Sequence, residues 1–213
     1  MTNGPIIVFD SGVGGLSIYR PLRAALPNEN IVYIADSAYF PYGDKSSEWL
    51  LKRFRTLARQ FSDLFPHLIV LACNSATTNV ISEVRSLVAC QVVGVEPVIK
   101  PLARYKSSLA LMTDASAHSE ATAILCEKYG KNVHIYVPHG LASAIEFNDY
   151  EQVKRSVGEI KKMVQKYHVE AVGLSCTHYP LIMPILKKAM PGIAFIDPAP
   201  AVVRQVQKVL RLS

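Results

Sequence analysis

Short hydrophobic runs alternate along the chain with longer segments in which hydrophobic residues recur every three or four positions. The short runs contain four or five residues and are rich in β-branched side chains, a pattern typical of buried strands. We predict eight strands, four in each half of the chain, at residues 6–9, 31–34, 68–72, 92–95, 109–112, 133–137, 171–174 and 193–196.

The segment from Ser46 to Phe65 shows the clearest helical pattern. Its hydrophobic residues repeat at spacings of three and four, with charged residues between them, which predicts an amphipathic helix. The repeating residues are Leu50, Phe54, Leu57, Phe61 and Leu64. Strands that alternate with helices of this kind indicate an α/β protein with mainly parallel sheets.

The two halves of the chain also agree in the spacing of their polar residues. In each half, a polar residue ends the first strand, a second polar residue lies 26 positions later, and a cysteine lies 63 positions later. The matching residues are Asp10, Asp36 and Cys73 in the first half, and Thr113, His139 and Cys176 in the second. This agreement predicts an internal duplication and therefore two pseudo-symmetric domains with mainly parallel sheets.

Two prolines, Pro97 and Pro101, punctuate the chain where the halves join. We expect a first α/β domain at residues 1–97 and a second at 98–198. A C-terminal helix at 199–213 is expected to return to the first domain. Ligands of open α/β sheets bind beyond the carboxyl ends of the strands, so we expect the active site in the cleft between the domains.

Each half places a cysteine directly after a buried strand and before a helix start. The two segments are Ala72-Cys73-Asn74 and Ser175-Cys176-Thr177. A helix N-terminus stabilises a thiolate, so both thiols are well placed for proton transfer. Two such thiols on either side of one ligand predict a two-sided acid/base site.

The composition excludes several classes of protein. Half of the 213 residues are hydrophobic, which argues against disorder. The four cysteines are widely and irregularly spaced and lack the Cys-x-x-Cys pattern, so we expect neither disulfides nor a metal site. Cys90 and Cys126 are interpreted as small packed core residues.

The net charge of +6 is spread over predicted helix faces, and no nucleic-acid recognition motif accompanies it. We therefore expect a small anionic substrate as the partner, and neither nucleic acid nor a membrane. The longest mainly apolar stretch, residues 68–72, is far shorter than the roughly 20 residues that span a bilayer. No signal peptide is evident, so we expect a cytoplasmic protein.

The glycine-rich segment from Asp10 to Ser17, Asp-Ser-Gly-Val-Gly-Gly-Leu-Ser, invites interpretation as a dinucleotide site. The dinucleotide fingerprint requires Gly or Ala where Ser17 stands, and Asp10 would repel a pyrophosphate. We favour a tight turn whose backbone N–H groups suit a carboxylate. Asp10 is then either a helix cap or a partner of the nearby cysteine.

Three further segments each have a structural and a functional interpretation. Pro41-Tyr42-Gly43 is a simple turn, or it supplies backbone N–H groups and a tyrosine wall to a site. The residues after Cys73 cap a helix, or they provide neutral hydrogen-bond donors for a carboxylate. His178, two residues after Cys176, is structural, or it assists proton transfer as a neutral imidazole.

At these segments the chain resembles the glutamate racemases of the aspartate/glutamate racemase superfamily. The resemblance runs through five motifs in the same order: Phe9-Asp10-Ser11-Gly12-Val13-Gly14-Gly15-Leu16, Ala35-Asp36-Ser37, Pro41-Tyr42-Gly43, Ala72-Cys73-Asn74-Ser75-Ala76-Thr77 and Cys176-Thr177-His178-Tyr179-Pro180. A histidine after the second Cys-Thr favours glutamate racemase over aspartate racemase, whose pattern has a glutamate there.

The resemblance implies a cofactor-independent and metal-free isomerase, a homodimer, that supplies D-glutamate for peptidoglycan. It implies that Cys73 and Cys176 are the two proton-transfer bases, assisted by Asp10 and His178 respectively. The positions that match substrate-binding residues are Asp10, Ser11, Pro41, Tyr42, Gly43, Cys73, Asn74, Ser75, Thr113, Thr177 and His178. Ser116 also matches a threonine that follows the first strand of the second half.

The chain departs from the family pattern at several positions. Ser75 replaces a threonine, Met112 replaces a glycine, and the stretch at His139 diverges from a cysteine-containing one. Glu146 only loosely matches an auxiliary glutamate. Family members continue beyond the position of Ser213. These departures leave two alternatives: a non-catalytic ligand-binding or regulatory relative, and a racemase for aspartate or another amino acid.

Overall fold

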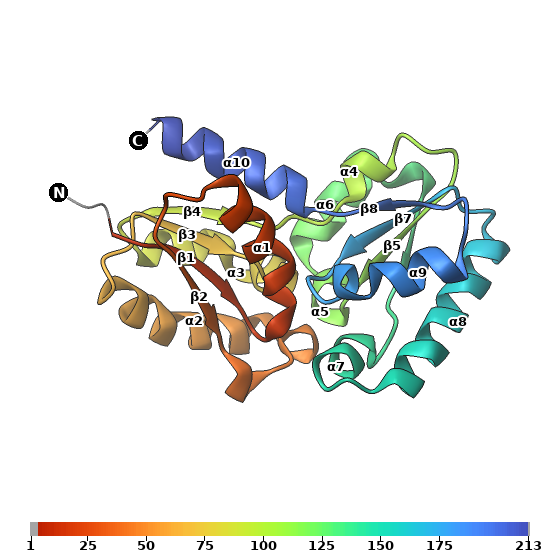
Figure 1. The fold of residues 1–213 in the computed structure, drawn as a ribbon, viewed down its shortest axis with the longest axis horizontal. Helices are drawn as coiled ribbons and strands as arrows, with labels where there is room; N and C mark the ends of the chain where they lie inside the picture. The colour runs from red at the N-terminus through yellow and green to blue at the C-terminus, as the bar shows by residue number, and fades with distance from the viewer. Residues whose placement is uncertain (1–3, 213) are drawn as a thin grey trace.

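The computed structural model describes residues 4–212 and contains two similar parallel sheets (Figure 1). The first sheet has the order β2-β1-β3-β4, and the second has the equivalent order β6-β5-β7-β8. Their strands are β1 (Ile6–Asp10), β2 (Ile31–Ala35), β3 (Leu68–Leu71), β4 (Gln91–Gly94), β5 (Ser108–Met112), β6 (Val133–Tyr136), β7 (Ala171–Ser175) and β8 (Ala194–Ile196). Both the α/β class and the eight predicted strands are confirmed.

Helices follow the strands in both halves. They are α1 (Leu16–Ala25), α2 (Ser47–Ser62), α3 (Asn74–Leu87), α4 (Ile99–Leu102), α5 (Asp114–Ala117), α6 (Glu120–Tyr129), α7 (Leu141–Glu146), α8 (Tyr150–Lys166), α9 (Met183–Ala189) and α10 (Ala199–Leu212). The predicted amphipathic helix is α2. It begins after Ser46, whose hydroxyl accepts a hydrogen bond from the N–H of Trp49 at 3.2 Å.

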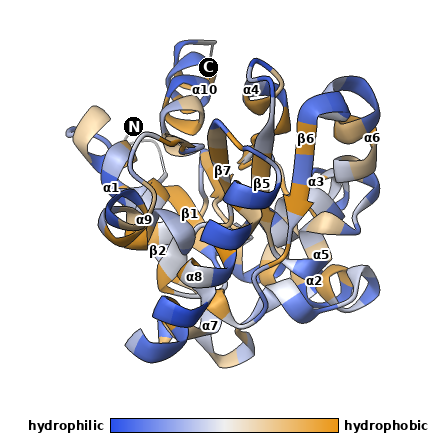
Figure 2. Ribbon diagram, turned by 90° about the vertical axis from the view of Figure 1, so that its right-hand side faces the viewer, coloured by the Kyte–Doolittle hydropathy of each residue, from blue (hydrophilic) through white to orange (hydrophobic). Residues whose placement is uncertain are grey.

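The first sheet is covered by helices on both faces, because successive side chains of each strand point to opposite sides. Ile7 and Phe9 of β1 pack with α2 and α3, whereas Ile6 and Val8 pack with α1 and α10. The strands β1, β5 and β7 are therefore hydrophobic, and the outward face of α8 is hydrophilic (Figure 2). Within residues 4–212, no helix combines the length and the hydrophobicity needed to cross a bilayer.

The helix α10 packs against the first sheet although the strand before it, β8, belongs to the second (Figure 1). Val202 and Val206 of α10 are buried in the same cluster as Val8 of β1 and Leu22 of α1. The chain therefore crosses between the two halves twice, before α4 and again before α10.

The pairing register refines the internal comparison drawn from the sequence. Phe9 pairs with Leu71 in the first sheet, and Leu111 pairs with Leu174 in the second. Relative to the cysteine-bearing strand, Met112 therefore occupies the place of Asp10. The sequence spacing matched Asp10 with Thr113, which is one position too far along, because spacing alone does not report how strands pair.

Candidate active site

The carboxyl ends of the central strands of both sheets face one small cavity of about 50 Å³. Both cysteines line it, together with residues of the loops that follow β1, β2, β3, β5, β6 and β7. The lining residues are Asp10, Ser11, Phe40, Pro41, Gly43, Asp44, Cys73, Asn74, Ser75, Thr113, Pro138, His139, Gly140, Ala142, Ser143, Cys176, Thr177, His178 and Tyr179. The two halves therefore share a single candidate site.

In the first half, Asp10 and Cys73 lie together at the ends of β1 and β3. Asp10 is fully buried, and its carboxylate accepts hydrogen bonds from Ser11 N–H at 2.7 Å and from the Thr177 hydroxyl at 2.8 Å. Burial raises the pKa of Asp10. Burial and the neighbouring charge of Asp10 raise the pKa of Cys73 well above its usual value. Cys73 is therefore a thiol near neutral pH.

In the second half, Cys176 faces a histidine that is bound to a carboxylate. His178 Nδ1 lies 3.8 Å from Cys176 Sγ, and His178 Nε2 lies 2.7 Å from Glu146 Oε2. Burial alone lowers the pKa of His178, but hydrogen bonds to Cys176 and Glu146 outweigh it and raise that pKa to about 10. His178 is therefore an imidazolium rather than the neutral group that we predicted, and it places a positive charge beside Cys176.

Glu146 contacts the candidate site through His178, a contact that sequence reasoning undervalued. It comes from the end of α7, and its carboxylate also accepts a hydrogen bond from the Val13 N–H at 2.9 Å. Burial raises the pKa of Glu146, but the bonds from His178 and Val13 outweigh it and lower that pKa. The signal in the sequence was weak because Glu146 is 32 positions from His178 and only the fold brings them together.

Several hydrogen bonds join the two halves across the cavity. Besides the Thr177–Asp10 and Val13–Glu146 bonds, the hydroxyls of Ser75 and Thr113 lie 2.9 Å apart. Each bond uses a residue that directly follows a strand or lies in the loop after it. The cavity is therefore closed by polar contacts between residues of the two half-sites.

Most of the predicted substrate-binding residues line the cavity, but Tyr42 does not. The Tyr42 ring is fully buried beside Phe9, Trp49 and Phe54, which lie in the core of the first half. The tyrosine wall that we predicted is therefore wrong. Position 42 places an aromatic ring behind the loop, and Pro41 and Gly43 face the cavity instead.

Three other polar residues singled out in the sequence are His139, Asp36 and Ser116, and only His139 lines the cavity. Asp36 does not line it, because its carboxylate binds Arg53 and the hydroxyl of Tyr42. Ser116 is buried on α5, where its N–H donates to the Thr113 hydroxyl that caps this helix.

Asn74 carries a buried acceptor that points to a ligand. It is 2% exposed and lines the cavity, and its side-chain N–H donates to the carbonyl of Val95 at 3.1 Å. Its Oδ1 is one of the buried polar atoms that have no hydrogen-bond partner within the described chain. A buried amide oxygen of this kind fits an N–H donor of a bound molecule.

The glycines after β1 are required by close packing. A side chain at Gly14 would overlap His178, and one at Gly15 would overlap Asp10 and Tyr33. The Tyr33 hydroxyl donates to the carbonyl of Gly12. The turn therefore fits closely around the two half-sites, in agreement with the tight turn that we predicted.

The four cysteines are free. Cys73 and Cys176 are buried, whereas Cys90 and Cys126 are only half-buried. Both pack against hydrophobic clusters of the core, Cys90 in the first half and Cys126 in the second, so the prediction of packed residues holds, although neither is fully buried.

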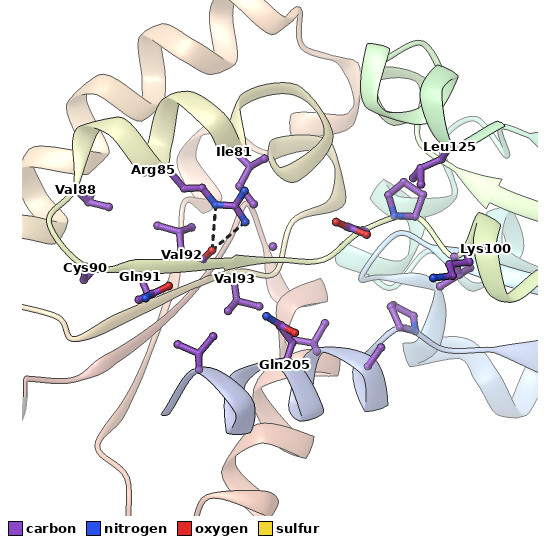
Figure 3. A pocket seen from close by; sticks show the side chains of 18 of the residues that line it. Ile81, Arg85, Val88, Cys90, Gln91, Val92, Val93, Lys100, Leu125 and Gln205 are labelled. Atoms are coloured by element: carbon purple, nitrogen blue, oxygen red, sulfur yellow. Dashed lines mark hydrogen bonds between the residues drawn. The ribbon is translucent and has the colours of Figure 1, made fainter. Parts of the chain in front are cut away.

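A larger groove of about 880 Å³ lies away from these residues (Figure 3). It follows the outer edge of β4, between α3 and α10, and the Arg85 guanidinium donates to the carbonyl of Val92 at 3.2 Å within it. None of the residues at the ends of β1, β3, β5 and β7 lines this groove. Size alone therefore does not identify the active site, and the chemistry of the lining residues does.

Comparison with known proteins shows the family to which the chain belongs. The sequence profile of the Asp/Glu/Hydantoin racemase family matches residues 20–206. The chain belongs to this family. The glutamate racemase of Stutzerimonas stutzeri is 36% identical over 216 residues, which covers 97% of this chain and 81% of that relative. The glutamate racemase of Pseudomonas syringae pv. tomato is 33% identical and covers 99% and 80%.

Solved structures of the family have the same fold. Glutamate racemase from Francisella tularensis, in complex with D-glutamate, superposes with a TM-score of 0.87 at 29% identity, covering 100% of this chain and 82% of that one. The Escherichia coli glutamate racemase, in complex with L-glutamate and the activator UDP-MurNAc-ala, gives 0.82 at 28% identity, covering 98% and 83%. The predicted kinship with glutamate racemases and the isomerase class are confirmed.

Proposed function

We propose that this protein interconverts L-glutamate and D-glutamate by proton transfer at Cα between Cys73 and Cys176. The observation that carries the proposal is the position of the two thiols. They come from equivalent strand ends of two different sheets and line one cavity. Inversion of a carbon requires removal of a proton from one face and delivery to the other, so one base on each face is needed.

The half-sites are suited to opposite tasks in each turnover. A thiolate on Cys176, beside the imidazolium of His178, takes the Cα proton, and the Cys73 thiol donates its own proton to the opposite face. The reverse reaction exchanges these roles. Atoms balance, because one thiol is gained and one is lost in each direction. No cofactor takes part in this proposal.

The remaining cavity residues suit an amino dicarboxylate. The Asn74 Oδ1 accepts from an ammonium group, and the hydroxyls of Ser11 and Ser75 donate to carboxylates, while the Thr177 hydroxyl is held by Asp10. Donors aimed at the α-carboxylate also stabilise the carbanion-like charge that develops when Cα loses its proton. Anchoring both carboxylates reduces the entropic cost of aligning Cα with the thiols.

Substrate binding requires the two halves to move apart. A cavity of about 50 Å³ has room for a few water molecules and not for glutamate. We propose that the chain divides near residue 97 into the two domains predicted from the sequence, with the C-terminal helix on the first. Separation then breaks the polar contacts across the cavity, and closure on the substrate forms them again.

Deuterium incorporation at Cα in D₂O, followed by proton NMR with each enantiomer of glutamate, tests the proposal. We expect exchange together with inversion in both directions. Folded protein that neither exchanges nor inverts either enantiomer would overturn the proposal, and glutamate binding without exchange would establish the non-catalytic alternative. The same assay with aspartate tests the substrate preference.

The family resemblance extends the proposal to a cytoplasmic homodimer that provides D-glutamate for peptidoglycan. Light scattering during size-exclusion chromatography measures the oligomeric state. Growth of a D-glutamate-requiring bacterium that expresses this chain tests the supply of D-glutamate.

A further inference from the structure

One wall of the cavity is the loop between β2 and α2. Phe40, Pro41, Gly43 and Asp44 of this loop line the cavity. Gly43 also faces Thr113 of the other half so closely that an added side chain would lie 2.8 Å from the Thr113 Cβ. The position of this loop therefore affects both the shape of the cavity and the fit between the halves.

Behind the loop lies a buried polar cluster formed by Asp36, Tyr42 and Arg53. The Arg53 guanidinium binds the Asp36 carboxylate at two points, with Nε at 2.8 Å and Nη2 at 2.6 Å. The Tyr42 hydroxyl donates to the same carboxylate. The hydrogen bonds to Asp36 raise the pKa of Arg53, and burial together with the bond to Asp36 raises the pKa of Tyr42, so both stay protonated. None of the three side chains lines the cavity.

The cluster connects the loop after β2 with the helix α2 and with the end of β1. Asp36 begins the loop, Tyr42 lies within it, and Arg53 comes from the middle of α2. The Asp36 N–H also donates to the carbonyl of Asp10 at 2.9 Å, which links the loop to the strand end of the first half-site. The Arg53 guanidinium lies 4.0 Å from the centre of the Tyr39 ring.

The pairing of Asp36 with Arg53 is expected on energetic grounds. A buried carboxylate is costly unless its partners satisfy it, and a two-point arginine–carboxylate pair also restricts orientation. Asp36 is 8% exposed and Arg53 17% exposed, so solvent screens this pair weakly. The pair can therefore fix the loop more firmly than the exposed pairs of α8 fix their own surroundings.

We propose that Asp36 and Arg53 are positioning residues that hold the loop at residues 40–44 in the shape that binds the substrate. This inference rests on the proposed racemase function. A wall that contacts the substrate similarly in the ground state and the transition state affects binding more than chemistry. Loosening it should therefore raise KM and leave kcat nearly unchanged.

Steady-state racemisation by Arg53→Met, with Arg55→Met as the control, tests the proposal. Arg55 lies on the same helix but is exposed. We expect Arg53→Met to raise KM for glutamate roughly tenfold and to change kcat less than about threefold, because the loss acts on uniform binding. Arg53→Lys keeps the charge but loses the two-point geometry, so it should give a smaller increase in KM.

Hydrogen exchange of the substrate-free protein provides a second readout that needs no activity. The amides of Tyr39, Phe40 and Lys45 donate within the loop and report on its order. They should exchange faster in Arg53→Lys than in Arg55→Met. Because Arg53→Met leaves Asp36 unpaired and can unfold the protein, Arg53→Lys and the double variant Asp36→Asn/Arg53→Met keep the test valid.

The two measurements separate the two proposals. A wild-type protein without racemase activity would overturn the proposed function, while exchange would still test whether the cluster orders the loop. Unchanged exchange in the Arg53 variants would overturn the role of the cluster. Faster exchange with unchanged KM, or a fall in kcat with unchanged KM, would overturn the assignment of Asp36 and Arg53 as positioning residues.

Discussion

The two halves of the molecule have the same strand order and unequal chemistry at the equivalent strand ends. In the first half, the carboxylate that accompanies Cys73 comes from β1, as Asp10. In the second half, the equivalent place is taken by Met112. The partner of Cys176 is His178, from the loop after β7, and His178 in turn binds Glu146 of α7. One thiol therefore has an anionic neighbour and the other a cationic one.

This difference shows how a repeated sheet can suit a reaction that takes place on the two opposite faces of one carbon atom. Repeating the sheet places two thiols at comparable positions, because the carboxyl end of a central strand is set by the fold. Changing one neighbour from a carboxylate to a histidine changes the charge that lies beside the thiol. A protonated thiol on one side and a thiol beside an imidazolium on the other are what the proposed two-base transfer requires.

Removing either thiol should lower the racemase activity more than any other single change. We expect Cys73→Ala and Cys176→Ala each to lower kcat/KM for glutamate by about 10²- to 10⁴-fold, the range typical of a lost general acid or base. Chiral chromatography of the products measures the loss. Cys126→Ala is the control, since Cys126 lies outside the cavity. Racemisation at the wild-type rate by either variant would contradict the two-thiol mechanism.

Neutralising the carboxylate of Glu146 should cause the next largest loss of activity. Glu146→Gln keeps a hydrogen bond to His178 but removes the charge that favours the imidazolium, and we expect kcat/KM to fall by about 10- to 100-fold. Because the two enantiomers have equal free energies, kcat/KM must fall equally in both directions. Glu151→Gln, at an exposed carboxylate, should retain full activity. An equally small effect of both changes would exclude this role for Glu146.

The charge on His178 predicts how the stability of the folded protein depends on pH. Its pKa is about 10 in the folded protein and about 6.5 when unfolded, so the stability gained from its proton is complete below pH 6.5 and decreases as pH rises toward 10. Between pH 6.5 and 8.5, we expect the free energy of unfolding to decrease by about 2 kcal/mol from this group.

Urea denaturation of the wild type and His178→Gln across this pH range measures the dependence. Thiols of the unfolded chain begin to ionise near the upper end of this range, at a pKa of about 8.5, and the comparison with the variant, which has the same cysteines, corrects for them. The variant should show a flatter profile than the wild type. Parallel profiles for the two proteins would show that His178 is neutral in the folded state.

The contact between the halves should give the smallest effect. Thr113→Val removes the hydrogen bond between the hydroxyls of Ser75 and Thr113, worth about 1 kcal/mol in the free energy of unfolding, and it also removes the hydroxyl that caps α5. A double-mutant cycle with Ser75→Ala isolates the interaction. Additive effects of the two substitutions would show that this contact does not couple the halves.

Most of the fold follows from local pattern in the sequence. All eight strands and the helix α2 were predicted, because buried strands and amphipathic helices each leave a regular hydrophobic period. The two cysteines and the polar residues beside them were also predicted, since they directly follow strands. Tyr42 was placed wrongly, because adjacent loop residues can face opposite sides and the motif contains no information about which side.

The sequence by itself determined the order of the elements and the position of each thiol at the end of a strand. These features depend on neighbours within a few residues along the chain. The tertiary structure alone decided that Met112 and not Thr113 corresponds to Asp10, that Glu146 reaches His178, and that His178 is charged. Strand register, contacts across the cavity and burial arise from residues far apart in the chain, and they set the charges that surround the two thiols.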